Sequence, residues 1–335
     1  FFKQKTAYEI STRDWSSDVC SSDLDLIGIA HAVVAGDRRA LAKALTLIER
    51  GGSVARELRR ALPATPQGTL IGVTGAPGAG KSSLVTALTR ELRTRGVPVG
   101  IMAVDPSSPL SGGSLLGDRI RMFDLAGDSG VFIRSMANRG QYGGLAATTT
   151  DAAWLMRAAG FPIVFLETVG AGQSDVAVAE VADTVLLVEA PGMGDEVQSI
   201  KAGLLEVADV IAVTKSDRAD APATVQQLRA LVRMQHVQPD AWSVPVVAVS
   251  TLNAQGIADC VDVLLAHAQW HQAHPLTQRR HYQHQLALQR AVGAQVLDVV
   301  MQSDVWRDAM DAMISVADVD EWADRVIHAF IRMRR

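Results

Sequence analysis

The chain has 335 residues, of which 48% are apolar and 20% are charged, and its formal net charge is −4. These values describe a globular protein with a sizeable core, long enough for one large domain with appendages or for two domains. The slightly acidic balance gives no overall basic field to attract nucleic acid or an anionic membrane, and no apolar run reaches the roughly 18 residues of a membrane span. The two cysteines, Cys20 and Cys260, lie far apart, which argues against a disulfide framework or structural zinc site and favours the cytoplasm.

The first 24 residues (FFKQKTAYEISTRDWSSDVCSSDL) differ from the rest of the chain. They show no sustained helical or strand period and lack the apolar core of a signal peptide. The string resembles translated sequencing-adapter DNA. We therefore expect residues 1–24 to be a non-native leader or a disordered tail.

Residues 25–62 have a helical pattern, because apolar side chains recur at spacings of three and four. Gly36 and Asp37 divide this stretch into two helices, and the pair Gly51-Gly52 ends the second. Two prolines then mark a linker. The sequence predicts a helical N-terminal extension over residues 25–66.

The middle of the chain alternates short apolar strands with helices. Continuous Val/Ile/Leu strands that alternate with helices are typical of a parallel sheet buried on both faces. We therefore predict an α/β fold with a mostly parallel central sheet flanked by helices, in a domain at 67–270. The expected strands are 69–74, 97–104, 131–134, 162–166, 184–188, 210–213 and 244–249, with helices at 82–95 and 145–159 among them.

The strands stop after about residue 269. Residues 281–301 and 319–332 have helical patterns, the first with a rough apolar stripe. The sequence predicts a helical C-terminal arm over 271–335.

The motif GxxxxGK[ST] occupies residues 75–82, between a predicted strand and a predicted helix, which is the context that this motif requires. Its glycines let backbone N–H groups converge on phosphate oxygens, and the following helix offers its positive N-terminus to the same anion. Lys81 supplies charge to the β- and γ-phosphates, the Ser82 hydroxyl is a ligand for Mg²⁺, and Ser83 is placed for an α-phosphate. Ala76 stands where phosphate loops of the MinD and ArsA type carry a second lysine, which argues against that ATPase branch. The motif predicts a P-loop nucleotide hydrolase.

The predicted strand 210–213 ends in the string TKSD, where GTPases commonly have Asn-Lys-x-Asp. The carboxylate of Asp217 can accept two hydrogen bonds from guanine, whereas adenine offers no such pair of donors. The aliphatic stem of Lys215 can cover the ring face. Thr214 replaces the usual asparagine, so one supporting hydrogen bond is altered. Residues 250–252, at the end of the last strand, fit the loop whose backbone contacts the guanine O6, so we expect GTP as the nucleotide.

Acidic residues follow two of the predicted strands. Glu167, at a strand tip near the phosphates, is expected to hold Mg²⁺ directly or through water. Gly170 would let a backbone N–H approach the γ-phosphate, as in a switch that senses hydrolysis. Asp105, at the second strand tip, and Asp118, in a glycine-rich segment, are further candidates near the metal. The sequence names no residue that orients the attacking water.

These interpretations define one candidate site for GTP or GDP with Mg²⁺. The candidate catalytic residues are Lys81, Asp105, Asp118 and Glu167, and the candidate metal ligands are Ser82, Asp105, Asp118 and Glu167. The candidate nucleotide-binding residues are Gly75, Ala76, Pro77, Gly78, Ala79, Gly80, Lys81, Ser82, Ser83, Gly170, Lys215, Asp217, Ser250, Thr251 and Leu252.

Longer strings give the motifs a family context. With these motifs in place, the chain resembles the MeaB/ArgK family of P-loop GTPases, to which the human MMAA protein belongs. The resemblance covers roughly residues 68–256, and the flanking helices also fit. The strings that carry it are VDPSSP at 104–109, GGSLLGDRIRM at 112–122, ETVGAGQS at 167–174 and PGMGDEVQ at 191–198.

The resemblance implies a function that residue spacing alone does not show. Family members couple GTP binding and hydrolysis to adenosylcobalamin loading, protection and reactivation of methylmalonyl-CoA mutase or a related acyl-CoA mutase. It also implies a homodimer with a C-terminal dimerisation arm. No nucleic-acid or membrane partner is expected.

Two other functions are weighed against this one. A nickel-insertion GTPase for hydrogenase or urease maturation would use a Cys/His site. The chain has a loose group of histidines without a cysteine, which we expect to face solvent, with two of them one helical turn apart. A protein kinase, as the older ArgK label suggests, would need an acceptor pocket that the sequence does not reveal. The histidines are His271, His274, His281 and His284.

Overall fold

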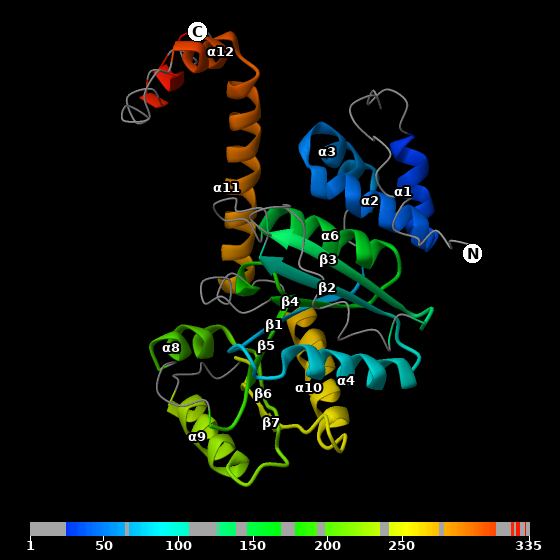
Figure 1. The fold of residues 1–335 in the computed structure, drawn as a ribbon, viewed down its shortest axis with the longest axis vertical. Coiled ribbons are helices and arrows are strands. Elements are labelled where there is room, and N and C mark those ends of the chain that lie inside the picture. The colour runs from blue at the N-terminus through cyan, green and yellow to red at the C-terminus, as the bar shows by residue number, and fades with distance from the viewer. Residues whose placement is uncertain are drawn as a thin grey trace, which may run out of the picture.

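The computed structural model places a parallel sheet at the centre of the chain, with helices on both of its faces and a long helix that rises away from it (Figure 1). Asp118 and Gly170 lie outside the described residues. The structure describes residues 25–63, 67–106, 125, 127–138, 146–168, 178–192, 198–234, 241–274 and 278–312, with 323, 324, 326–328 and 332.

The sheet has seven strands in the order β3-β2-β4-β1-β5-β6-β7, and every neighbouring pair is parallel. β1, β5 and β6 are buried along their whole length, as expected for strands covered on both faces. The predicted α/β fold is thereby confirmed. The strands are β1 (Thr69–Thr74), β2 (Val99–Pro106), β3 (Val131–Asn138), β4 (Ile163–Thr168), β5 (Thr184–Glu189), β6 (Val210–Val213) and β7 (Val246–Ala248).

Two apolar layers sandwich this sheet, because successive strand side chains point to opposite faces. On one face, Ile71 and Phe165 pack in a core with α4 and α10. On the other face, Leu70 and Leu166 join a core that includes α6 and the N-terminal helices, while α8 packs on β5 and α9 packs on β6 and β7. The covering helices are α4 (Lys81–Thr94), α6 (Ala146–Ala158), α8 (Gln198–Val207), α9 (Ala221–Met234) and α10 (Ile257–Ala273), and a short 3₁₀ helix, η3 (Val178–Glu180), precedes β5.

The N-terminal extension has three helices where the sequence predicted two. The pair Gly51-Gly52 does end the second helix, but both residues adopt positive φ, 72° and 76°, and turn the chain straight into a third. Asp37 caps the second helix by accepting hydrogen bonds from two backbone N–H groups of its first turn. The three helices are α1 (Leu26–Val34), α2 (Arg38–Arg50) and α3 (Gly52–Ala61).

Polar contacts fix this extension to α6 and β3. Arg59 of α3 forms an ion pair with Asp151 at 3.1 Å and lies 3.3 Å from the ring centroid of Trp154. Arg134 of β3 pairs with Glu49 of α2 at 2.7 Å. The three helices are therefore held to the edge of the sheet by charge as well as by the shared core.

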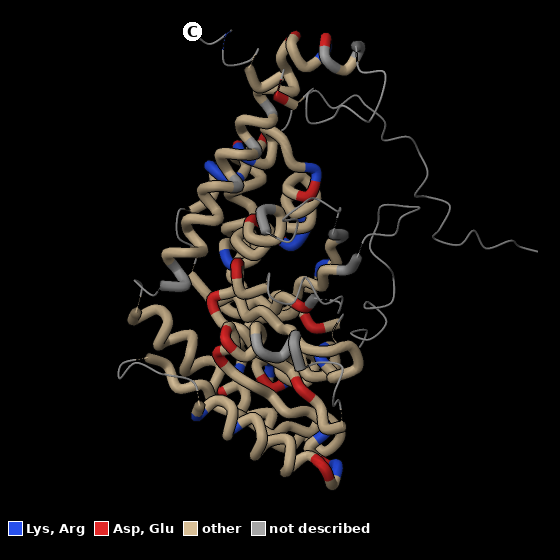
Figure 2. The backbone as a smooth tube through the Cα atoms, turned by 90° about the vertical axis from the view of Figure 1, so that its left-hand side faces the viewer, with Lys and Arg blue, Asp and Glu red and all other residues tan. Residues whose placement is uncertain are grey.

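The C-terminal part is an arm. α11 (Gln278–Met301) contacts α6 and η3 near its beginning and carries α12 (Asp304–Ala312), which the sequence did not predict, at its far end (Figure 1). At that end Val300 and Val326 form a small separate cluster with Val305 and Trp306. Basic and acidic residues are interspersed along the described elements (Figure 2).

The histidine prediction was partly wrong. His281 and His284 of α11 are exposed, as expected, and so is His274. His271 of α10 is only 5% exposed, and its ring lies 6.0 Å from that of His267, which is also buried. Both rings occupy the side of α10 that packs on the sheet, so they belong to the core.

Candidate functional site

The phosphate loop follows β1 and depends on glycines with positive φ. Gly75, Gly78 and Gly80 have φ of 142°, 77° and 93°, which side chains other than glycine rarely adopt. At Gly75 there is also no room, because a Cβ would lie 2.1 Å from the carbonyl oxygen of Val188 in β5. The loop is thus pressed against the tip of the neighbouring strand.

The loop leads directly into α4. Gly80 is the N-cap residue and supplies no side-chain hydrogen bond to the first turn, so the backbone N–H groups there face the loop without a side-chain acceptor from the cap. An anion is the natural acceptor for such a helix start. Ser83, expected near an α-phosphate, is exposed in this first turn.

Lys81 lies inside the curve of the loop. Its side chain is only 7% exposed, and Nζ donates to the carbonyl oxygens of Gly75 at 2.6 Å and Ala76 at 3.2 Å. These bonds hold the ammonium group against the start of the phosphate loop. The arrangement concentrates positive charge where the motif requires phosphate.

Ser82 and Glu167 meet beside Lys81, although they are far apart in the sequence. The Ser82 hydroxyl donates to Oε1 of Glu167, and Glu167 is only 2% exposed at the tip of β4. A hydroxyl and a carboxylate are the hard oxygen donors that Mg²⁺ prefers, and Mg²⁺ commonly takes one or two protein oxygens together with phosphate and water. The donor set therefore fits the expected metal.

Asp105 belongs to the same edge of the sheet. It lies in β2 directly after Val104, which pairs with Thr168 of β4, so its backbone reaches the level of the Glu167 strand tip. The register brings these two predicted acidic positions together.

The residues of the predicted base site lie beyond the end of β6 and of β7. The Ser250 hydroxyl donates to Oδ1 of Asp217 at 2.6 Å, and this hydrogen bond, with a smaller contribution from the Asp217 backbone N–H, lowers the pKa of the Asp217 carboxyl below its ordinary value. Asp217 is exposed while Ser250 is fully buried. A buried hydroxyl thus steadies a carboxylate that stays open to a ligand.

Lys215 and Thr214 join the base site to the phosphate loop. Lys215 has φ of 53°, and its Nζ donates to the carbonyl oxygen of Gly78 at 3.1 Å. The Thr214 hydroxyl lies 2.5 Å from the carbonyl oxygen of Ala79 and 3.0 Å from that of Glu189. The threonine that replaces the usual asparagine therefore still ties the two loops together at a fixed separation.

Sequence reasoning missed the contribution of β5. The carbonyl oxygens of Val188 and Glu189 lie against Gly75 and Thr214 respectively. No motif marks this strand tip, and only the sheet order shows that β5 lies between β1 and β6. It also missed the Ser250 side chain, since residues 250–252 were expected to act through their backbone.

The remaining predicted residues of the last loop face solvent. Thr251 is exposed and Leu252 is 85% exposed. Neither side chain is packed into the protein, and the sequence expectation for these two residues concerns their backbone atoms.

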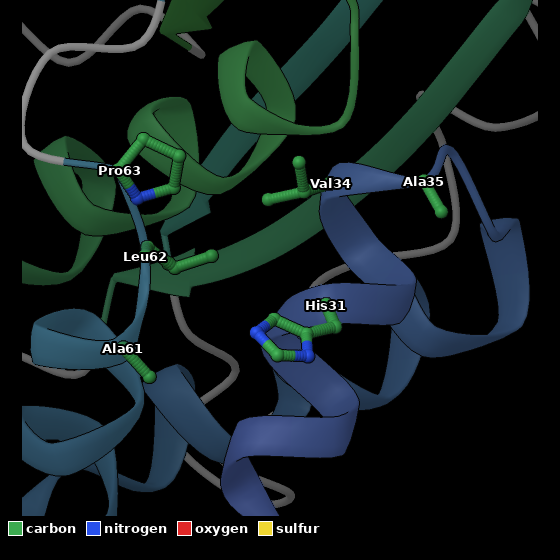
Figure 3. A pocket seen from close by; sticks show the side chains of 6 residues that line it. All are labelled: His31, Val34, Ala35, Ala61, Leu62 and Pro63. Carbon is green, nitrogen blue, oxygen red and sulfur yellow. The ribbon is translucent and has the colours of Figure 1, made fainter.

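A hollow of about 470 Å³ lies elsewhere, between α1 and the end of α3 (Figure 3). His31 is the one titratable group among its lining residues, so the hollow offers no charge cluster for a phosphate. It is lined by His31, Val34, Ala35, Ala61, Leu62 and Pro63.

A protein-family model described as Methylmalonyl Co-A mutase-associated GTPase MeaB matches residues 41–304. The chain is 46% identical over 239 residues, which is 70% of its length and 74% of the relative's, to a GTPase-family protein of Pyrococcus abyssi. It is 35% identical over 251 residues, 69% of this chain and 60% of the relative, to the mitochondrial methylmalonic aciduria type A homolog of Mus musculus.

A solved structure supports the fold. The crystal structure of LAO/AO transport system kinase is similar with a TM-score of 0.67 and 24% identity, covering 92% of this chain and 99% of that one. Among the residues placed by the structure, no helix is long and apolar enough to cross a membrane, and no group of three or more His, Cys, Asp or Glu could hold a metal ion.

Replacing Lys81 by Ala should abolish nucleotide turnover and raise the Kd for GTP by about 100-fold or more, because the phosphates lose their main charge partner. Isothermal titration with GTP and a phosphate-release assay measure both effects. Lys43→Ala, on the exposed side of α2, is the control and should change neither. Undiminished hydrolysis by the Lys81→Ala variant would show that the phosphate loop is not part of the active site.

Replacing Asp217 by Asn should weaken GTP and favour XTP, because xanthine carries a carbonyl where guanine carries an amine and so needs a donor instead of an acceptor. Loss of one charged hydrogen-bonding pair is worth roughly 10- to 100-fold in GTP affinity. Competition binding with GTP, XTP and ATP tests this. Asp220→Asn, which changes an exposed neighbour paired with Arg218, is the control and should keep the GTP preference. If both variants prefer GTP over ATP and XTP as the wild type does, Asp217 does not bind the base.

Proposed function

Because the chain belongs to the MeaB family of methylmalonyl-CoA mutase-associated GTPases, we propose that it is a GTP-driven chaperone that assists adenosylcobalamin loading, protection and reactivation of methylmalonyl-CoA mutase or a related acyl-CoA mutase. The observation that carries this proposal is the family match over residues 41–304, which spans the phosphate loop, the residues of the predicted base site and α11. The resemblance inferred from the sequence motifs is thereby confirmed, and the GTPase class with it.

The proposed roles of the site residues follow from their contacts. Lys81 neutralises phosphate charge from inside the loop, and Asp217, steadied by Ser250, selects guanine. Ser82 and Glu167 hold Mg²⁺, with the Asp105 and Asp118 carboxylates proposed as further ligands and Gly170 as the contact to the γ-phosphate.

Hydrolysis needs positioning and charge neutralisation more than covalent chemistry. Water forms a bond to the γ-phosphorus while the bond to the bridging oxygen of GDP breaks, and negative charge spreads over the phosphate oxygens. When bound, Mg²⁺ would neutralise part of the charge that develops on the phosphates. Glu167 fixes the Ser82 hydroxyl by accepting its hydrogen bond, and the amides at the start of α4 would receive the phosphates.

The family also favours the mutase over the other two candidate functions. The family description names a mutase-associated GTPase, whereas nickel insertion or protein phosphorylation rests on no observation of the described residues. We propose the cytoplasm as the compartment, which the sparse use of cysteine favours.

We propose the domain boundaries 25–66 for the helical extension, 67–270 for the GTPase domain and 271–335 for the dimerisation arm. α10 continues to Ala273, so the arm begins structurally with α11.

A homodimer is part of the proposal, and α11 supplies the argument. Leu288, Val292, Val296 and Val299 are 65%, 53%, 53% and 39% exposed, and their spacings of four, four and three place them on one stripe. Gln283, which bonds the body of the protein, lies on the opposite side of the helix. An exposed apolar stripe that faces away from its own domain is typical of a surface that pairs with a second chain.

Replacing Val292 by Asp should dissociate the dimer, because a carboxylate would be buried at the middle of the stripe. We expect the dimer Kd to rise by roughly 30-fold or more, the effect of losing about 2 kcal/mol at an interface core. Sedimentation velocity over a concentration series measures it. Leu297→Asp, an exposed apolar position on the other side of α11, is the matched control, and a Val292→Asp chain that dimerises like the wild type would refute the arm as the interface.

The mutase proposal predicts a complex whose affinity depends on the nucleotide. Immobilised methylmalonyl-CoA mutase should retain the wild-type chain with Kd values that differ by at least about threefold between GDP and a non-hydrolysable GTP analogue, because a switch must bind its client differently in its two states. Lys81→Ala should bind with one Kd under both conditions. Absence of binding with either nucleotide would contradict the proposal that methylmalonyl-CoA mutase is the client.

A further inference from the structure

The side chain of Gln283 bonds the beginning of α11 to the turn formed by η3 and the residues after it. Gln283 is half-buried, and its Nε2 donates to the carbonyl oxygens of Ala179 at 2.8 Å and Ala182 at 2.9 Å. A primary amide has two N–H donors, and here both serve the same short turn. The arm therefore holds the turn from its outer side.

The inner side of η3 rests directly on β1. Val178 is fully buried, and a Cβ placed on Gly72 would lie 2.0 Å from its Cγ1 and 2.8 Å from the Cβ of Ala182. Only a glycine lets the turn come this close, so strand and turn cannot shift independently. Gly72 lies beside Val73, which pairs in register with Glu167, and just before Gly75.

The end of η3 is tied to the same strand. The Asp183 carboxylate accepts hydrogen bonds from the Leu70 backbone N–H at 2.8 Å and from Arg157 of α6 at 3.1 Å, and the Asp183 N–H donates to the Leu70 carbonyl. The turn is thus clamped between β1 and α6 on one side and the arm on the other. Gln283 is the residue through which the arm holds this turn.

We infer that Gln283 is a positioning residue for GTP hydrolysis, acting through η3 and β1 on the spacing between the phosphate loop and Glu167. The path runs from the Gln283 amide to the two carbonyls of the turn, then through Val178 to Gly72. A change of well under 1 Å at the reacting groups is enough to alter a turnover rate. The inference rests on the GTPase activity and is independent of the mutase and of the dimer.

This role differs from that of a residue that only anchors the arm. An anchoring residue affects the stability of the protein and the position of α11, whereas a positioning residue changes kcat while ground-state nucleotide affinity stays the same. Gln283 touches neither the loop nor Glu167, so its removal should leave the contacts that bind GDP in place. This split between turnover and affinity is the decisive readout.

Gln283→Met tests the inference, because it keeps the length and helix propensity of the side chain and removes both donors. We expect kcat for GTP hydrolysis to fall by about 3- to 10-fold, and the Kd for GDP to stay within about twofold. Single-turnover phosphate release and titration with a fluorescent GDP measure these values on the full chain. Gln285→Met, an exposed glutamine on the same helix, is the matched control and should behave as wild type.

A second variant covers the case in which methionine packs poorly. Gln283→Glu lacks N–H donors and sets a carboxylate against two carbonyl oxygens, so kcat should fall at least as far as in Gln283→Met. Unchanged kcat in both variants would overturn the inference. So would parallel losses of kcat, GDP affinity and melting temperature, which would assign Gln283 to packing alone.

Discussion

The site depends on the absence of a side chain at Gly75. The phosphate loop can follow β1 only because the chain passes over the Val188 carbonyl oxygen at a distance that no Cβ permits. This close approach presses the loop onto β5, and β5 in turn carries the Glu189 carbonyl that Thr214 contacts. Phosphate loop, central strands and base loop therefore form one unit, and the burial of β1 and β5 stabilises it.

Such a unit suits a reaction governed by electrostatics. Lys81, the start of α4 and the Ser82–Glu167 pair are fixed by backbone and strand tips that are already packed. Preorganised groups need little rearrangement when charge develops on the phosphates, and they act more strongly where water is excluded. Glu167, almost fully buried at the tip of β4, is held in this way by the sheet itself.

Much of this could be predicted from the sequence, because the motifs combine strong local signals. The strands 69–74 and 210–213 have the predicted bounds, since continuous apolar runs end there at turn residues. The contacts of Gly75 with β5 and of Ser250 with Asp217 could not be predicted, because they depend on the order of strands in the sheet. The spacing of residues along α10 could have identified His271 as buried. Buried positions 260, 264, 267 and 271 of α10 recur every three or four residues, as on one side of a helix.

The order of strands also bears on how the chain is made. β1 is synthesised first, yet its neighbours are β4 and β5, and the loop that follows it is closed by Val188, Thr214 and Lys215. A ribosome delivers these parts in sequence, so the nascent chain carries its phosphate motif for more than a hundred residues before the partners that shape it have emerged. The nucleotide site is consequently complete only after the later strands have been synthesised. GTP or GDP, by binding only the finished arrangement, would act as a ligand that pulls folding to completion.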